Sequence, residues 1–126
     1  MASGYDLDDP GEDMPVSVRE AFREALPRDV ARIRAGFDQS SPDALFRAAH
    51  DIKGQAPLFG YGLVAAVATI LAELTRGHST FDPGRRACVL AHVEALETLI
   101  ANDIKGGGGD LGRALLAELE IRRQGL

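Results

Sequence analysis

The chain has 126 residues and a formal net charge of −5, and 45% of its residues are hydrophobic. This length favours one domain with one core. No apolar run approaches the length of a membrane-spanning helix, and the N-terminus lacks the basic and apolar segments of a signal peptide. The single cysteine, Cys88, excludes an internal disulfide and favours a reducing compartment. We therefore expect a cytoplasmic protein with no membrane partner.

The negative charge is concentrated at the N-terminus. Residues 1–15 contain five acidic residues and no Lys or Arg, so residues 16–126 carry all 14 basic residues and the other 14 of the 19 acidic ones. We expect 1–15 to be a disordered acidic leader and 16–126 to form a helical bundle. Because the body is neutral and its Arg residues are scattered, no nucleic-acid partner is expected.

The first part of the body has helical apolar spacing, as does nearly all of the remaining sequence. Ser17 and Glu20 form a capping box, which predicts a helix that begins at Ser17. Pro27 is expected to break or kink this segment. A second piece then follows, with one apolar face formed by Val30, Ile33 and Phe37.

The next helix is predicted to begin with Ser41 as N-cap and Pro42 as its first residue. It extends to the mid-50s, and its apolar residues form one stripe: Leu45, Ala49, Ile52, Ala56 and Phe59. Gly60 allows a structural turn. A partner helix then runs up to Gly77, with an apolar face made of Val64, Val67, Leu71 and Leu74.

A third long helix is predicted from Asp82 as N-cap and Pro83 as first residue, with an apolar face of Val89, Val93, Leu96 and Ile100. Four glycines at 106–109 are expected to end it. Asp110 is expected to cap a last helix, whose face carries Leu111, Leu115 and Leu119. No segment is typical of a strand. The prediction is an all-α fold, an antiparallel up-down four-helix bundle with a short extra N-terminal helix.

The tetrapeptide Asp-Ile-Lys-Gly occurs twice, at 51–54 and at 103–106. The second copy runs into the four glycines, which makes Lys105 and Gly106 an ordinary helix end, with a cation at the negative terminus and a C′ glycine. In the first copy helix periodicity continues to Ala56, so Gly54 lies inside a helix at a cost of about 0.8–1 kcal/mol relative to Ala. The two copies are therefore not a repeated site.

His50 precedes the first copy and lies about 100° round the helix from the core stripe. Its ridge is shared by residues at −4, +3, +4 and +7, which are Phe46, Lys53, Gly54 and Pro57. A solvent-facing imidazole is a nucleophile at neutral pH, and Lys53 could offset the charge of a phosphoryl group on the ring. Phe46, Gly54 and Pro57 are expected to form an exposed docking surface, where Gly54 would let a bulky partner come close. Pro57 is also expected to kink or end the helix.

The segment AHDIKGQAPLFGYGLVAAVATILAEL resembles the histidine-containing phosphotransfer (Hpt) domain of bacterial two-component phosphorelays. The resemblance is specific over residues 45–74 and rests on Ala49, His50, Ile52, Lys53, Gly54 and Gly60. It implies a four-helix bundle in which His50 is phosphorylated on Nε2. It also implies partners that are receiver domains of response regulators, or a hybrid histidine kinase. No cofactor of its own is implied, because the receiver supplies Mg²⁺.

One position departs from the pattern of this family. Its members often carry Glu or Gln twenty-two residues after the histidine, where the side chain accepts a hydrogen bond from the ring, but this chain has Ala72 there. Gln55 and Glu73 are the two candidates for orienting the His50 ring, although Glu73 is about 100° round the helix from position 72. The orienting residue is left open between them.

The leading hypothesis is a phosphorelay intermediate, a phosphoryl carrier rather than an enzyme with its own turnover. The alternative is a non-transferring interaction module that docks a receiver or histidine kinase. A helical enzyme is disfavoured because no second catalytic group accompanies His50. Cys88 and His92 could place two metal ligands on one helix face, but two are too few, so no metal site is expected. We expect a monomer.

Overall fold

The structure is a computed structural model that describes Gly11 and residues 13–126. These residues form five α-helices, one short 3₁₀ helix and no strand, which confirms the all-α prediction. The elements are α1 (Val16–Asp38), α2 (Pro42–Gln55), the 3₁₀ helix η1 (Ala56–Phe59), α3 (Gly62–Thr75), α4 (Pro83–Ala101) and α5 (Gly109–Gln124). The acidic leader expected at 1–15 lies mostly outside the described residues. None of the described helices is both long and apolar enough to cross a membrane.

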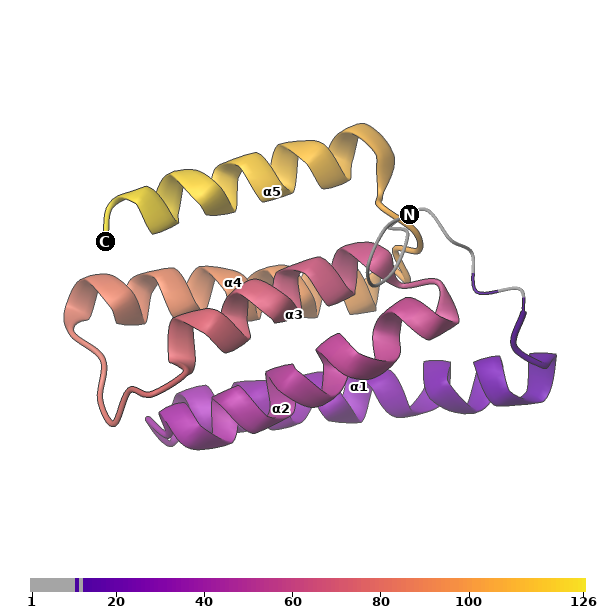
Figure 1. Cartoon of the computed structure of the whole chain (residues 1–126), viewed down its shortest axis with the longest axis horizontal. Helices are drawn as coiled ribbons and strands as arrows, with labels where there is room; N and C mark the ends of the chain where they lie inside the picture. Colours follow the sequence, from indigo (N-terminus) through magenta and orange to yellow (C-terminus); the bar gives the residue numbers. More distant parts are fainter. Residues whose placement is uncertain (1–10, 12) are drawn as a thin grey trace.

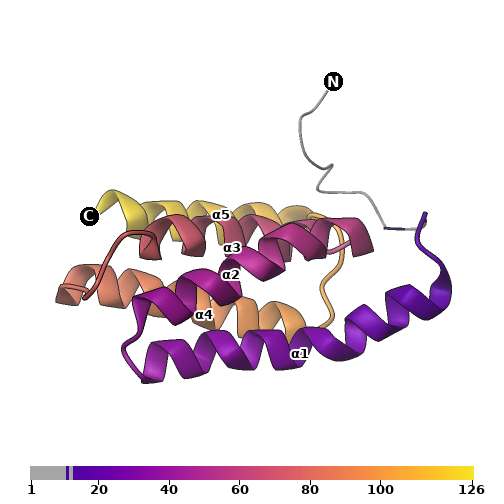
Figure 2. The same cartoon turned by 60° about the horizontal axis from the view of Figure 1, so that its bottom comes forward.

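Four of the helices surround the core. Helix α1 packs against α2 and α4, and α3 packs against the same two helices, so α1–α4 form a closed ring of contacts. Helix α5 lies outside this ring and packs mainly against α4 (Figures 1 and 2). The residues that the helical period assigned to the core are buried in the ring, among them Leu45, Ile52, Val67, Leu71, Val89 and Val93.

Helix α1 is continuous over 23 residues, so the expected break at Pro27 is wrong. The short N-terminal helix expected before Pro27 is instead the first half of α1, which belongs to the ring. A proline at this position cannot donate a hydrogen bond to the carbonyl of Arg23, four residues earlier. Both residues are exposed, so water is available to that carbonyl and the helix continues.

The predicted capping box at the start of α1 is also wrong. The helix begins at Val16, Pro15 is its N-cap, and Ser17 already lies in the first turn. No side chain caps this end. The Pro15 carbonyl accepts hydrogen bonds from the backbone N–H groups of Val18 and Arg19, each at 3.0 Å. The fixed φ of proline, here −54°, leads the chain into the helix two residues earlier than Ser17 would as the N-cap.

The starts of α2 and α4 agree with the sequence. The Ser41 hydroxyl oxygen accepts a hydrogen bond from the Ala44 N–H at 3.2 Å, and a carboxylate oxygen of Asp82 accepts one from the Arg85 N–H at 2.8 Å. A proline occupies the first turn of both helices. These caps satisfy backbone donors that have no partner inside the helix, which fixes where each helix begins.

The segment between α4 and α5 differs from the prediction. Helix α4 ends at Ala101, so Lys105 and Gly106 lie in a loop and do not form a helix end. Asp110 does not cap α5, because the helix begins at Gly109 with Gly108 as N-cap. Gly108 has a φ of 73°, and a Cβ there would approach Leu63 Cδ2 to 2.8 Å. Of the three leucines expected to face the core from α5, Leu119 is buried, Leu115 is half-buried and Leu111 is 63% exposed.

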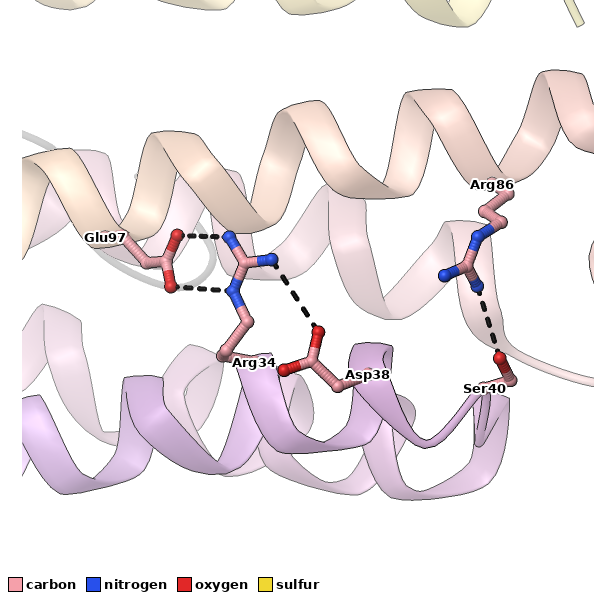
Figure 3. Close-up of polar contacts among 5 residues, drawn as sticks. All are labelled: Arg34, Asp38, Ser40, Arg86 and Glu97. Atoms are coloured by element: carbon pink, nitrogen blue, oxygen red, sulfur yellow. Dashed lines mark hydrogen bonds and ion pairs between the residues drawn. The ribbon is translucent and has the colours of Figure 1, made fainter.

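Polar contacts join α1 to α4 on the side away from α2 and α3 (Figure 3). The guanidinium of Arg34 donates two hydrogen bonds to the Glu97 carboxylate, at 2.9 and 2.6 Å, and lies 3.8 Å from Asp38. The Arg34 hydrogen bonds hold the pKa of Glu97 below its usual range, and the same pairing raises the pKa of Arg34. Arg86 donates to the Ser40 hydroxyl at 3.3 Å. The bidentate pair of Arg34 and Glu97 fixes the register of α1 against α4.

Candidate functional site

The ring architecture exposes one face of α2. Leu45, Ala49, Ile52 and Ala56 are buried against α1 and α3, while His50 is exposed. The rotation of about 100° per residue explains this difference, because His50 follows a fully buried alanine directly. The histidine therefore lies on the outer surface of a helix whose backbone is held from inside by the core.

The His50 imidazole is stacked on Phe46, one helical turn earlier. The two ring centroids are 5.7 Å apart and the ring planes differ by 22°. The guanidinium carbon of Arg76 lies 5.6 Å from the centroid of the same phenyl ring. Arg76 is the C-cap residue of α3, which runs back along α2 after a short turn. The end of α3 therefore meets the start of α2 at the Phe46 ring.

Lys53 lies one turn after His50 and is half-buried. It has no ion-pair partner among the described residues, whereas neighbouring Asp51 lies 3.4 Å from Arg32 of α1. An ammonium group that is not paired with a carboxylate is available to an incoming anion. This face of α2 therefore combines an exposed nucleophile with an uncompensated positive charge.

Gly54 has no structural reason to be a glycine. It is exposed, its φ is not positive, and a Cβ added there would meet no atom within 4 Å. Neither backbone strain nor close packing inside the chain explains the residue. The bare surface beside His50 and Lys53 is thus available for close approach by another molecule.

Pro57 does not belong to this ridge, so its expected exposure is wrong. Helix α2 ends at Gln55, and Pro57 is buried within η1. The tighter 3₁₀ turn rotates the residues after Gln55 away from the α-helical stripe. Leu58, which the periodicity did not place on the surface, is instead 55% exposed. The end of the ridge is therefore an exposed leucine and not a proline.

No hydrogen bond joins the His50 ring to Gln55 or Glu73, the two candidates for orienting it; within the described residues the imidazole makes none at all. Both candidate side chains are exposed. Ala72, at the position where an acceptor was looked for, is 1% exposed and contributes only to the core. The contact that the ring does make is the stack on Phe46.

The turn after η1 is fixed by Gly60, which has a φ of 87° as the expected turn requires. Its carbonyl accepts a hydrogen bond from the Gly106 N–H at 2.7 Å, and the Gly106 carbonyl accepts one from the Leu63 N–H at 2.8 Å. The turn between α2 and α3 is thereby fastened to the loop before α5. This anchor holds the far end of the α2–α3 pair.

The other two histidines lie elsewhere. His78 is exposed in the loop after α3, near the Phe81 ring at 6.1 Å. His92 is fully buried in α4, and its Nδ1–H donates to the Cys88 carbonyl at 2.8 Å. Burial lowers the pKa of His92 and raises the pKa of the Cys88 thiol. Among the described residues no three potential ligands come together as a metal site would require.

One hollow on the described part of the chain lies away from His50. A groove of about 530 Å³ lies between α4 and α5, and no residue of α2 lines it. Half of the residues that line the groove are alanine or leucine, and no histidine or cysteine is among them.

Sequence reasoning missed Arg76 and Leu58. Arg76 lies at the end of α3 and not on α2. The sequence did contain a signal for it: a short connection makes neighbouring helices antiparallel, so the end of α3 lies beside the start of α2. Leu58 was hidden because the α-helical period was extended through a segment that is 3₁₀. Neither residue could be found from spacing on α2 alone.

The fold and the His50 ridge define a class of protein: a small helical module with a histidine exposed on the surface of one helix. The sequence model of the Hpt domain family matches residues 17–121, and the chain belongs to this family. Hpt domains are phosphocarrier modules of two-component systems, and they interact with receiver domains and histidine kinases. No curated protein and no solved structure matches the chain.

Proposed function

We propose that this protein is a phosphorelay intermediate in which His50 accepts a phosphoryl group from a receiver-domain aspartate and passes it to a second receiver. The observation that carries the proposal is the exposed His50 imidazole beside Lys53, a cation with no ion-pair partner in the described chain. Membership in the Hpt domain family supports the same role.

The transfer is a displacement at phosphorus. The lone pair on Nε2 of neutral His50 attacks the phosphorus of the aspartyl phosphate, a P–N bond forms, and the P–O bond to the carboxyl group breaks. The electron pair of that bond leaves with the aspartate carboxylate, and the histidine keeps its proton on Nδ1, so that loss of the phosphoryl group in the second step restores the neutral imidazole. In the second step a carboxylate oxygen of the next receiver attacks the same phosphorus, and the P–N electron pair returns to Nε2.

Lys53 stabilises the charge of the phosphoryl oxygens, which grows as the group passes between donor and acceptor. The receiver contributes the aspartate pocket and its Mg²⁺, so the protein needs no cofactor of its own. The α1–α4 ring serves as an antiparallel up-down four-helix bundle, a rigid frame for the α2 surface. The protein carries the phosphoryl group and does not turn over a substrate by itself.

The docking surface in this proposal consists of Phe46, Gly54 and Leu58 around His50. Phe46 is half-buried, Gly54 is bare and Leu58 is 55% exposed. An apolar rim beside a position without a side chain suits close packing of a receiver around the imidazole. We further propose that the module acts as a monomer in the cytoplasm, where the free Cys88 stays reduced.

A second candidate is a non-transferring module that docks a receiver or histidine kinase through the same surface. It is favoured by one observation, the lack of any hydrogen bond to the His50 ring among the described residues. An unfixed ring would bind a partner as well as a fixed one but would transfer more slowly.

The two candidates are separated by incubating the protein with a ³²P-labelled phosphorylated receiver. A phosphorelay intermediate acquires acid-labile, base-stable label that is absent in His50→Gln and present in His78→Gln, the matched change of an exposed loop histidine. Label that persists in His50→Gln would refute the site. Receiver binding without label in the wild-type protein would establish the docking module instead.

A further inference from the structure

The orientation of the His50 ring depends on one neighbour. With neither ring nitrogen hydrogen-bonded to a described residue, the terminal torsion of a histidine is broad and the imidazole is free to turn. The stack on Phe46, with centroids 5.7 Å apart and ring planes 22° apart, favours one orientation of the imidazole. The i, i+4 spacing places the two rings on the same face of α2.

Phe46 is itself held from a second helix. The Arg76 guanidinium lies 5.6 Å from the phenyl centroid, within the range of a cation–π contact. Arg47, next to Phe46 in the chain, is engaged differently: its Nε lies 3.1 Å from Asp43 on the same helix. The end of α3 therefore fixes the Phe46 ring, whereas the neighbouring arginine does not.

We propose that Phe46 is a positioning residue for phosphoryl transfer at His50, and that Arg76 acts through Phe46 by fixing its ring. This inference rests on the proposed function and deepens it. Transfer requires the Nε2 lone pair to point along the line from the phosphorus to its leaving oxygen. A stacked imidazole needs less ordering at that moment than a free one. In this chain an aromatic stack thus does what a hydrogen bond to the ring would otherwise do.

Positioning and docking predict different kinetics. A contact that only binds the receiver changes the receiver concentration at half-saturation, whereas a contact that aligns the imidazole changes the transfer rate at saturation. A small phosphoryl donor such as phosphoramidate approaches His50 from any direction. Its reaction should therefore not depend on ring orientation, and it reports whether the imidazole is intact and accessible.

The test uses Phe46→Leu, Phe46→Tyr and Arg76→Gln, with Arg47→Gln as the matched arginine control. Transfer from a phosphorylated receiver should fall about threefold to tenfold at saturation in Phe46→Leu and recover in Phe46→Tyr, which keeps the stack. Arg76→Gln should lose about twofold to threefold, and Arg47→Gln should lose nothing. Phosphorylation by phosphoramidate should be equal in all of them.

Proton NMR of the imidazole gives an independent readout. The upfield ring-current shift of the His50 carbon-bound protons should disappear in Phe46→Leu and persist in Phe46→Tyr. Phe81→Leu is the control, because it removes the aromatic neighbour of His78 and should leave the His50 signals unchanged.

A saturated rate in Phe46→Leu equal to wild type, or His50 signals unaffected by that substitution, would overturn the positioning role. A wild-type protein that binds receivers yet takes no label from them would overturn the proposed function, and this inference with it. The two failures are therefore distinguishable, because only the second affects the wild-type chain.

Discussion

The two Asp-Ile-Lys-Gly segments have the same sequence but opposite surroundings. The copy at 51–54 lies within α2, where Ile52 enters the core and the other side chains face outward. Lys53 has no ion-pair partner in the described chain, and nothing lies within 4 Å of a Cβ at Gly54. Of the charged groups of this copy, Asp51 pairs with Arg32 of α1, whereas the Lys53 ammonium has no ion-pair partner among the described residues.

The copy at 103–106 is used inside the molecule. Asp103 accepts a hydrogen bond from the Tyr61 hydroxyl at 2.6 Å and lies 3.2 Å from Arg23, while Lys105 lies over the Tyr61 ring. Both backbone groups of Gly106 are bonded to the turn between α2 and α3. The same four residues therefore lie on an exposed helix face in one place and hold the fold together in the other, and the difference is set by the backbone around them.

The largest effect is expected from exchanging the residues that precede the two copies. The double variant His50→Asn, Asn102→His should lose receiver-dependent labelling down to background. Residue 102 is the C-cap of α4, where a new imidazole would have no unpaired lysine or bare glycine on its ridge. Acid-labile, base-stable label gives the measurement. Label on position 102 would show that the tetrapeptide itself defines the site.

The second-largest effect is expected from comparing the rates of phosphoryl transfer after substitution of Lys53 and of Lys105. Lys53→Ala is expected to slow transfer from a phosphorylated receiver about tenfold, because one cation is removed from the transferring phosphoryl group. Lys105→Ala should leave the rate within about twofold, since Lys105 contacts the Tyr61 ring in a different loop. Circular dichroism controls for folding. Equal rates for the two variants would contradict the assignment of Lys53.

The two glycines should change stability in opposite directions. Gly106 has a φ of 60°, so Gly106→Ala should lower the free energy of unfolding by about 1–2 kcal/mol. Gly54 lies in α2 with open space around it, so Gly54→Ala should raise that free energy by about 0.5–1 kcal/mol. Urea unfolding measures both. Destabilisation by Gly54→Ala would mean that this glycine has an internal role after all.

The smallest effect concerns the second copy and appears only at alkaline pH. Burial, and then the hydrogen bond to Asp103, raise the pKa of Tyr61 above its usual range. The folded protein therefore keeps a proton that the unfolded chain loses near pH 10, so this stabilisation is complete below pH 10 and declines as the pH rises further. Urea midpoints between pH 8 and pH 11 measure it. Tyr61→Phe should show a shallower decline than wild type, and an identical decline would contradict the assignment.

Local rules predicted the parts of this fold that depend on neighbouring residues. Ser41 and Asp82 cap their helices because an N-cap needs only the three residues that follow it. The exposure of His50 followed from the helical period alone. The family resemblance of residues 45–74 was likewise carried by a contiguous segment.

The sequence-based predictions are wrong where contacts with residues distant in the sequence determine the local structure. Helix α4 ends before the glycines because Asp103, with a φ of 48°, is held by Tyr61, the N-cap residue of α3. The contact between Arg76 and Phe46 depends on how α3 lies along α2, which no spacing on one helix encodes. Pro57 was misplaced for a local reason. The proline correctly predicted that the helix kinks or ends there, but the α-helical period was still used for the residues that follow, which form a 3₁₀ turn.

The position of α5 outside the ring has a consequence for how the molecule opens. Segments that share few contacts with the rest of a protein unfold separately, with a smaller free energy than the whole. Helix α5 packs mainly against α4, whereas α2 packs against α1 and α3. In amide hydrogen exchange we expect α5 to lose its protection first while α2 stays closed. The C-terminal helix could then detach and return many times without disturbing the surface that carries His50.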